Sequence, residues 1–216
     1  MVKKIRNGLG NLYLVLILLM LYLPIGILIV SSFNASPRNK AVWGGFSLAG
    51  YKNLIHNEVI MQALWTTLLL AAGAGILATV LGTMVCIAMV SMRRKWRTAI
   101  MGVTNIPLLN ADIVTGIALM LLFSRFTELS FGTMMIAHVT LIIPYVVLSV
   151  QPKMAQFNLS AYEAAVDLGA SPVYAIWKIV IPDIFPGILA GFMLAFTMSL
   201  DDFSVTYFTK APGIHT

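Results

Sequence analysis

The chain has 216 residues, of which 59% are apolar and only 10% are charged, and its mean hydropathy is +0.91. Soluble globular domains carry roughly 25% charged residues, so this composition excludes a water-soluble fold and indicates a chain embedded in lipid. The formal net charge of +6 comes largely from Lys and Arg clusters at the ends of apolar segments, so it gives no reason to expect a nucleic-acid partner.

Five segments are long and apolar enough to cross a membrane, which takes about 20 residues for a hydrocarbon core of about 30 Å. Backbone groups in lipid must pair within the chain, and no segment alternates as a barrel strand does, so the spans are expected to be helices. The sequence therefore predicts an all-α, polytopic helical bundle. Its spans are Leu9–Val30, Leu64–Val90, Ile100–Phe123, Phe131–Val150 and Ile184–Tyr207.

The first predicted span follows Lys3, Lys4 and Arg6, and its apolar stretch is longer than the 7–15 residues of a signal peptide. We therefore expect a retained helix. Lys and Arg favour the cytoplasmic side of a membrane. Because a second basic cluster, Arg93–Arg97, follows the second span, the N-terminus and this turn are both predicted to be cytoplasmic.

Small residues recur at intervals of four in two of the spans, which lets a second helix approach closely and pack by van der Waals contact. The sequence leaves open whether that helix belongs to this chain or to another subunit. These rows of small residues are Ala71-Gly75-Thr79, Ala74-Ala78-Gly82 and Gly187-Gly191-Ala195-Ser199.

Cys86, the only cysteine, lies inside a span, so neither an intrachain disulfide nor a metal site is predicted.

Three acidic residues fall inside predicted spans: Asp112 near the middle of the third, and Asp201 and Asp202 in the outer third of the fifth. A carboxylate at a helix centre costs roughly 2.5–3.5 kcal/mol, and such residues face a bundle interior or water and are functional candidates. Every Lys and Arg lies in a loop or at a span end. The remaining explanations are a cation from elsewhere, a wet cavity, a hydrogen-bonded neutral acid, or a misplaced span end.

Helix geometry and neighbouring residues suggest how three polar side chains of the spans are oriented or bonded: those of Asp201, Asp202 and His138. On a continuous helix Asp202 lies near the small-residue face that carries Ser199, whereas Asp201 points about 100° away from Asp202. His138, in the fourth span, is expected to pack through hydrogen bonds with Thr140 and Ser149 rather than to relay protons.

A polar hairpin separates the fourth and fifth spans. Ser160 and Glu163 have the spacing of a capping box at a helix start, and Gly169 fits the left-handed position that ends that helix. Ser171-Pro172 then begins a second short helix. Glu163 and Asp167 lie four residues apart, on one face of the first helix, where they could meet a basic groove.

The hairpin resembles the EAA loop of ABC importer permeases, with Glu163-Ala164-Ala165, then Gly169, then Ile179 to Pro182; Ile181 stands where the pattern usually has Leu. The resemblance implies the transmembrane domain of a type I ABC importer in an inner membrane. It also implies three partners: a second permease subunit, a cytoplasmic ABC ATPase dimer and an extracytoplasmic binding protein. The implied ATPase-coupling residues are Glu163, Ala164, Ala165, Asp167, Gly169 and Pro182.

The chain has no G-x-x-x-x-G-K-[ST] loop, so we expect ATP and Mg²⁺ to be bound by the ATPase and no cofactor or catalytic residue in this chain. H-E-x-x-H and G-x-S-x-G are also absent, which argues against an intramembrane enzyme. A passive channel needs no hairpin for coupling to an ATPase, so the hairpin also argues against that class of protein.

A narrower resemblance covers most of the chain. The segments Leu194–Phe203, Ala164–Pro182 and Asp112–Val114 are similar to the second permease subunit of spermidine/putrescine importers. That family implies polyamine cargo and a substrate pathway containing Trp43, Asp112, Ser199, Asp201 and Asp202. For Trp43, interfacial anchoring remains an equal alternative to a cation–π role. The alternative cargo is another small solute, such as an iron chelate or an opine.

We expect a single transmembrane permease domain over residues 1–216, with the cytoplasmic EAA loop at 151–183. Permeases of the resembled family commonly have six spans, whereas five are visible here. The expectation is therefore that the chain is incomplete at its C-terminus or that something else replaces the sixth helix.

Overall fold

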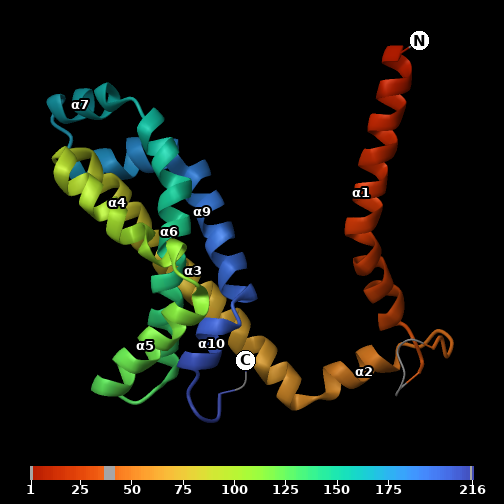
Figure 1. The fold of residues 1–216 in the computed structure, drawn as a ribbon. Helices are drawn as coiled ribbons and strands as arrows, with labels where there is room; N and C mark the ends of the chain where they lie inside the picture. The colour runs from red at the N-terminus through yellow and green to blue at the C-terminus, as the bar shows by residue number, and fades with distance from the viewer. Residues whose placement is uncertain (1, 37–41, 215) are drawn as a thin grey trace. The chain divides into compact units, whose positions relative to one another are not determined.

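The computed structural model describes residues 2–36, 42–214 and 216. Every regular element in this part of the chain is a helix, apart from one isolated antiparallel bridge between Asn34 and Phe46 (Figure 1). The prediction of an all-α chain is therefore confirmed. The helices fall into two compact units, Met1–Met61 and Gln62–Thr216.

The first unit holds two helices and the loop between them. Helix α1 (Val2–Ser32) contains a candidate membrane span at Asn11–Ser32, which agrees with the first predicted span, and α2 (Ala49–His56) follows the loop. Asn34 organises the loop: its side-chain carbonyl accepts the N–H of Gly44 at 2.8 Å, and its amide donates to the Val42 carbonyl at 2.7 Å.

The second unit is built around α6, which contacts α4, α5, α9 and α10. Buried apolar side chains line α6 along most of its length, so this helix forms the centre of the core (Figure 1). Helix α3 begins in the first unit and continues in the second. The elements of the second unit are α3 (Glu58–Ser91), α4 (Arg94–Leu109), α5 (Asp112–Phe126), α6 (Phe131–Gln156), α7 (Leu159–Asp167), α8 (Pro172–Ala175), the π-helix η1 (Ile176–Val180), α9 (Ile181–Asp201) and α10 (Ser204–Thr209).

Four helical segments of the described chain are long and apolar enough to cross a membrane, and a fifth crossing requires α4 and α5 to count as one broken span. These two helices bend by 107° at Asn110 and Ala111, whose backbones are extended. The prediction of one continuous helix over Ile100–Phe123 is therefore wrong. Pro107 weakens the helix before the break because it donates no hydrogen bond, and Asn110 is a poor residue for a helix interior.

The last long helix differs from its predicted bounds, because α8, η1 and α9 join into one apolar segment, Pro172–Asp201. Ser171 caps its start and Pro172 occupies the first turn, as predicted. The second helix of the hairpin is therefore not a separate element but the start of this span. Pro182 has no N–H to donate to the carbonyl four residues earlier. A π-turn lies directly before it, in which the Ile181 N–H bonds the Ile176 carbonyl.

The small-residue rows pack within this chain. A Cβ placed on Gly191 would lie 3.3 Å from Val146 Cα of α6, and one on Gly82 of α3 would lie 2.8 Å from a Val146 methyl. A Cβ on Gly75 would lie 3.3 Å from the ring of Phe192 on α9. All four members of the α9 row are buried: Gly187, Gly191, Ala195 and Ser199. The predicted close packing is confirmed, and the partner that the sequence left open lies in this chain: α6 for the α9 row and for Gly82, and α9 for Gly75.

Gly191→Val should loosen the α6–α9 interface, because the added side chain meets the backbone of α6 at Val146 Cα, which cannot move aside on its own. Overpacking of this kind costs about 1–3 kcal/mol, which should lower the thermal midpoint of the detergent-solubilised protein. Gly102→Val is the matched control, because nothing lies within 4 Å of a Cβ at Gly102 on α4. Equal midpoints for the two variants would contradict the proposed packing.

Candidate functional site

The start of the polar hairpin is set by Asn158. Its side chain accepts the N–H of Ser160 at 3.1 Å, and α7 begins at Leu159. The predicted capping box at Ser160 and Glu163 is therefore wrong, because Ser160 already lies in the first turn. Asn and Ser are both strong N-caps, and here the N-cap is Asn158, two positions before Ser160.

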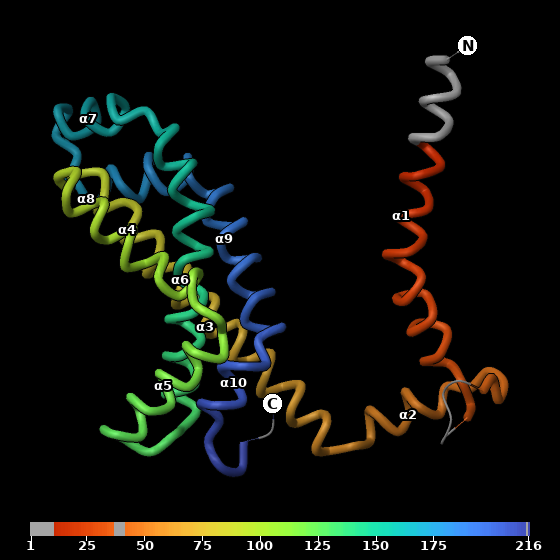
Figure 2. Tube along the Cα trace, viewed as in Figure 1, coloured from red at the N-terminus to blue at the C-terminus, as the bar shows by residue number. Residues whose placement is uncertain are grey.

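The end of α7 is confirmed as a left-handed glycine cap. Gly169 has φ +93°, its N–H bonds the Val166 carbonyl at 2.9 Å, and the Ala170 N–H bonds the Ala165 carbonyl at 3.0 Å. This pair of bonds is a Schellman motif. It turns the chain sharply from α7 into α8 (Figure 2).

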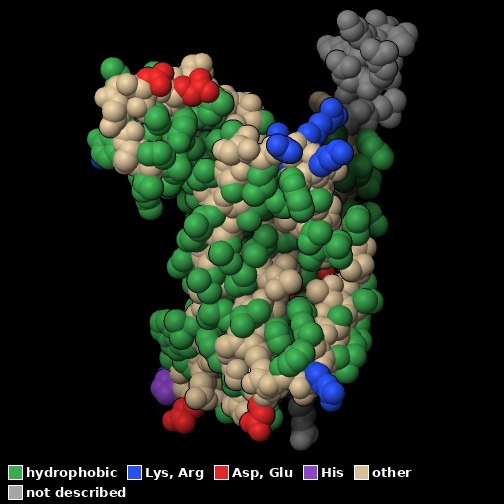
Figure 3. All heavy atoms as spheres, turned by 90° about the vertical axis from the view of Figure 1, so that its left-hand side faces the viewer, with side chains coloured by type: hydrophobic (Ala, Val, Ile, Leu, Met, Phe, Trp, Pro, Cys, Tyr) green, Lys and Arg blue, Asp and Glu red, His purple; other side chains and the backbone are tan. Residues whose placement is uncertain are grey.

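The hairpin exposes its acidic side chains at one end of the second unit. Glu163 and Asp167 are both exposed, as are Ala164 and Pro182, whereas Ala165 is half-buried. The basic turn between α3 and α4 lies at the same end (Figure 1). Figure 3 shows acidic and basic side chains gathered at this end, above a broad hydrophobic band. This arrangement is typical of a polar surface that projects from a membrane.

The second candidate region is a break in the predicted fifth span. Helix α9 ends at Asp201, and Asp202 has an extended backbone with φ −73° and ψ 110°. The Asp202 carboxylate accepts the N–H groups of Val205 at 3.3 Å and Thr206 at 3.0 Å, which caps α10. The prediction of a continuous helix through both aspartates is therefore wrong, and a span end stands at Asp201.

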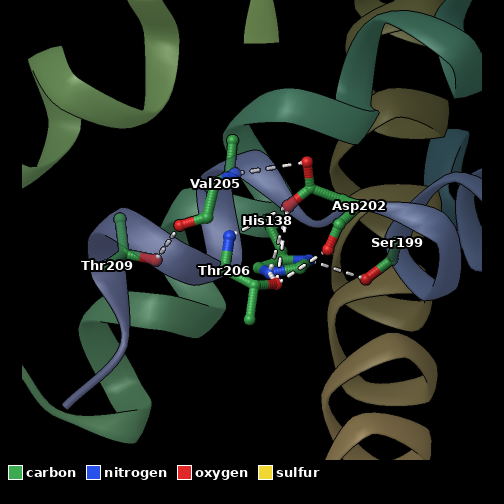
Figure 4. Close-up of polar contacts among 6 residues, drawn as sticks. All are labelled: His138, Ser199, Asp202, Val205, Thr206 and Thr209. Carbon is green, nitrogen blue, oxygen red and sulfur yellow. Dashed lines mark hydrogen bonds and ion pairs between the residues drawn. The ribbon is translucent and has the colours of Figure 1, made fainter. Parts of the chain in front are cut away.

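The imidazole of His138 on α6 lies against this break (Figure 4). Its Nδ1 is 2.9 Å from Ser199 Oγ, its Nε2 is 3.0 Å from Thr206 Oγ1, and the same Nε2 is 3.8 Å from Asp202 Oδ2. His138 is fully buried and the Asp202 side chain is 4% exposed.

The hydrogen-bonded role expected for His138 is confirmed, but the expected partners are wrong. Thr140 and Ser149 instead bond carbonyls of their own helix, those of Ile136 and Tyr145. A hydroxyl in a helix commonly bonds the carbonyl four residues earlier, and the imidazole bonds Ser199 and Thr206 of other helices instead.

Polar groups of Thr206 and Asp202 surround Nε2 of His138. Thr206 Oγ1 lies 3.0 Å from Nε2, 3.0 Å from the Asp202 backbone carbonyl and 3.5 Å from Asp202 Oδ2. A neutral imidazole donates from one nitrogen and accepts at the other, so the tautomer decides whether Nε2 donates to Thr206 or accepts from it. In either case the edge of the ring faces the Asp202 carboxylate at 3.8 Å, a pairing that no local sequence pattern indicates.

A cavity of about 260 Å³ adjoins the break. Both Asp201 and Asp202 line it, but Asp201 is exposed whereas the Asp202 side chain is only 4% exposed. The rings of Phe203 and Tyr207 stack with centroids 5.7 Å apart beside them. The lining is Thr67, Leu70, Ser199, Leu200, Asp201, Asp202, Phe203, Thr206, Tyr207, Lys210 and Thr216. The lining holds two carboxylates and one Lys ammonium beside hydroxyls and aromatic faces, so its acidic groups outnumber its basic group, which suits an organic cation.

Of the five predicted pathway residues, the structure brings three together, since Ser199, Asp201 and Asp202 line the same cavity. Asp112 is not among the lining residues. It is the exposed first residue of α5 and not the midpoint of a continuous span. Trp43 belongs to the first unit and is 55% exposed.

Sequence reasoning missed the pairing of His138 with Asp202 and the contribution of Thr206. His138 and Asp202 lie far apart in the sequence, and no local pattern connects them. The helix break itself had a signal, because Asp202 followed by Ser204 is a typical helix start.

Long apolar helices, closely packed through small residues and joined by an exposed polar hairpin, define a polytopic membrane transport protein. The chain belongs to the family of binding-protein-dependent transport system inner membrane components, which matches residues 76–215.

Three named relatives illustrate the similarity. The spermidine/putrescine transport system permease protein PotC of Haemophilus influenzae is 36% identical over 206 residues, which cover 95% of this chain and 80% of the relative. PotC of Escherichia coli K12 is 35% identical over 194 residues, covering 89% and 73%. The putrescine transport system permease protein PotI of the same organism is 34% identical over 204 residues, covering 91% and 72%.

Gly169→Val should disorder the turn after α7, because a β-branched residue is strained at a positive φ by roughly 1–2 kcal/mol. We expect faster amide hydrogen exchange in peptides that cover residues 159–170. Gly169→Asn is the control, because Asn tolerates this conformation better. Exchange that is unchanged in the Val variant would show that the glycine cap does not hold the hairpin.

Proposed function

We propose that the chain is the membrane-embedded permease subunit of an ATP-driven polyamine importer and forms half of its translocation pathway. The observation that carries this proposal is the exposed Asp201 carboxylate in the cavity at the α9–α10 break. Relatives named for spermidine and putrescine transport support the cargo.

The chemistry of the cavity suits a polyamine, which carries ammonium groups separated by methylene segments. Asp201 offers a charge-assisted hydrogen bond to one ammonium. The exposed faces of Phe203 and Tyr207 offer cation–π contact to a second ammonium or apolar contact to the methylenes. In this proposal Trp43, Asp112, Ser199 and Asp202 also belong to the pathway, outside the first contact with the cargo.

The hairpin would be the coupling element. A cytoplasmic ABC ATPase dimer, which binds ATP and Mg²⁺, would grip Glu163, Asp167 and the α7 turn at Gly169, with Ala164, Ala165 and Pro182 supporting the contact. In this proposal the N-terminus and the α3–α4 turn lie in the cytoplasm. A second permease subunit would complete the pathway, and an extracytoplasmic binding protein would deliver the cargo.

The continuous segment Pro172–Asp201 gives this coupling a mechanical basis. Its 30 residues extend roughly 45 Å at the rise of an α-helix, from the hairpin at one end to Asp201 at the cavity. A movement imposed on α8 is therefore transmitted along one helix to the carboxylate.

Glu163→Lys should abolish polyamine-stimulated ATP hydrolysis by the purified complex while leaving membrane insertion intact, because it reverses the charge of an exposed coupling residue. Glu128→Lys is the matched control. Glu128 is also exposed and lies in the α5–α6 turn, so its reversal should leave stimulation within about twofold of the wild type. Normal ATP-driven uptake by the Glu163 variant would overturn the coupling role.

Asp201→Asn should raise the spermidine concentration that gives half-maximal stimulation by about tenfold or more, the effect expected when a charge-assisted contact is lost. The measurement is ATPase activity of the reconstituted complex against spermidine and putrescine. Stimulation by an iron chelate or an opine, with no response to either polyamine in the wild type, would refute the proposed cargo.

A further inference from the structure

Two adjacent carboxylates stand in opposite environments at the end of α9. Asp201 is exposed to the cavity. Asp202 is 4% exposed, accepts two backbone N–H groups and lies 3.8 Å from His138 Nε2. A nearly buried carboxylate that already accepts two backbone hydrogen bonds is a poorer ligand for a new cation than an exposed one, because the cation would have to enter the wall and compete with those bonds.

We propose that His138 is a positioning residue that holds Asp202 in the cavity wall and so leaves Asp201 as the carboxylate that meets the cationic substrate. The inference rests on the proposed function for the identity of that substrate. The fixing of the break itself is independent of any cargo.

The imidazole reaches both sides of the break from a third helix. Nδ1 contacts Ser199, two residues before the end of α9, and Nε2 contacts Thr206 within α10 (Figure 4). Because α6 is the central helix of the unit, its fully buried imidazole acts as a fixed reference for both segments. The angle between α9 and α10, and hence the direction of Asp201, therefore depends on this side chain together with the packing of α10 on α5 and α6.

The other hydrogen bonds at the break do not fix that angle. Those from Val205 and Thr206 to Asp202 are local, and Thr209, which is also fully buried, bonds only the Val205 carbonyl of its own helix. Among the described polar side chains in Figure 4, His138 alone connects the break to α6. Thr209 therefore provides a control that removes a buried hydroxyl from α10 without touching the connection.

The first test needs no substrate. In the solubilised full chain with its associated subunits, thermal midpoints are measured for His138→Phe, Asp202→Asn, Asp201→Asn and the two double variants that contain His138→Phe. Contacting residues give non-additive changes and separate ones give additive changes. We expect the His138 and Asp202 changes to be non-additive and the His138 and Asp201 changes to add. Additive changes for His138 and Asp202 would overturn the proposal.

The second test separates positioning from packing. His138→Phe should raise the half-maximal spermidine concentration for ATPase stimulation by about tenfold, with the maximal rate within about twofold of the wild type. His138→Gln, which keeps a side-chain donor, should shift it by less than about threefold. Thr209→Val should leave it unchanged. In an Asp201→Asn background, His138→Phe should add less than about twofold, because its effect acts through Asp201.

Two results of the second test would overturn the proposal: shifts for His138→Phe and Asp201→Asn that multiply, or a shift for Thr209→Val as large as that for His138→Phe. If polyamines do not stimulate ATP hydrolysis by the wild-type complex, the proposed function is refuted, and with it the substrate part of the inference. The thermal measurements would still decide whether His138 fixes Asp202.

Discussion

The close approach of α9 to α6 is the contact on which the rest of the second unit depends. Burial from water does not drive association between helices in lipid, so they must gain van der Waals contact and hydrogen bonds instead. Gly191 and Gly187 remove side chains where α6 crosses, and Gly82 does the same on α3. Only this close approach brings Ser199 within 2.9 Å of His138 and seats the imidazole against the α9–α10 break.

The same helix connects the two candidate sites. The hairpin is held by the glycine cap at Gly169 and continues through a π-turn into α9, and α9 ends in the wall of the cavity. The π-turn lies beside Pro182, where the regular hydrogen-bond ladder is already interrupted. It is therefore the part of the helix whose hydrogen bonds most readily rearrange. In a transporter that couples movement of such a hairpin to a distant site, a continuous helix such as α9 can transmit the movement, and a turn with rearrangeable hydrogen bonds can lie near the hairpin.

The sequence predicted the features that local chemistry determines: the long apolar helices, the small-residue rows and the glycine cap after α7. It failed where two local choices compete or where a contact is distant in the chain. Asn158 and Ser160 are both good helix caps, and only the path of α6 into the hairpin selects the first. Composition made residues 100–123 one apolar segment, whereas the structure bends at Asn110 and Ala111. The pairing of His138 with Asp202 depends on helix packing and has no local pattern.

The difference between Asp201 and Asp202 shows how an apolar bundle can keep a charge available. A carboxylate left without partners in a dry interior would be neutralised or excluded. Asp202 avoids this through two amide donors and the edge of an imidazole, and in doing so it ends α9. The end of the helix in turn places Asp201 beside a cavity, where water or a cationic ligand can solvate it. No Lys or Arg nitrogen in the described part of the chain lies within 4.0 Å of either carboxylate. In the proposed pathway, the partnered aspartate thus shapes the opening in which the exposed one would hold an ammonium group.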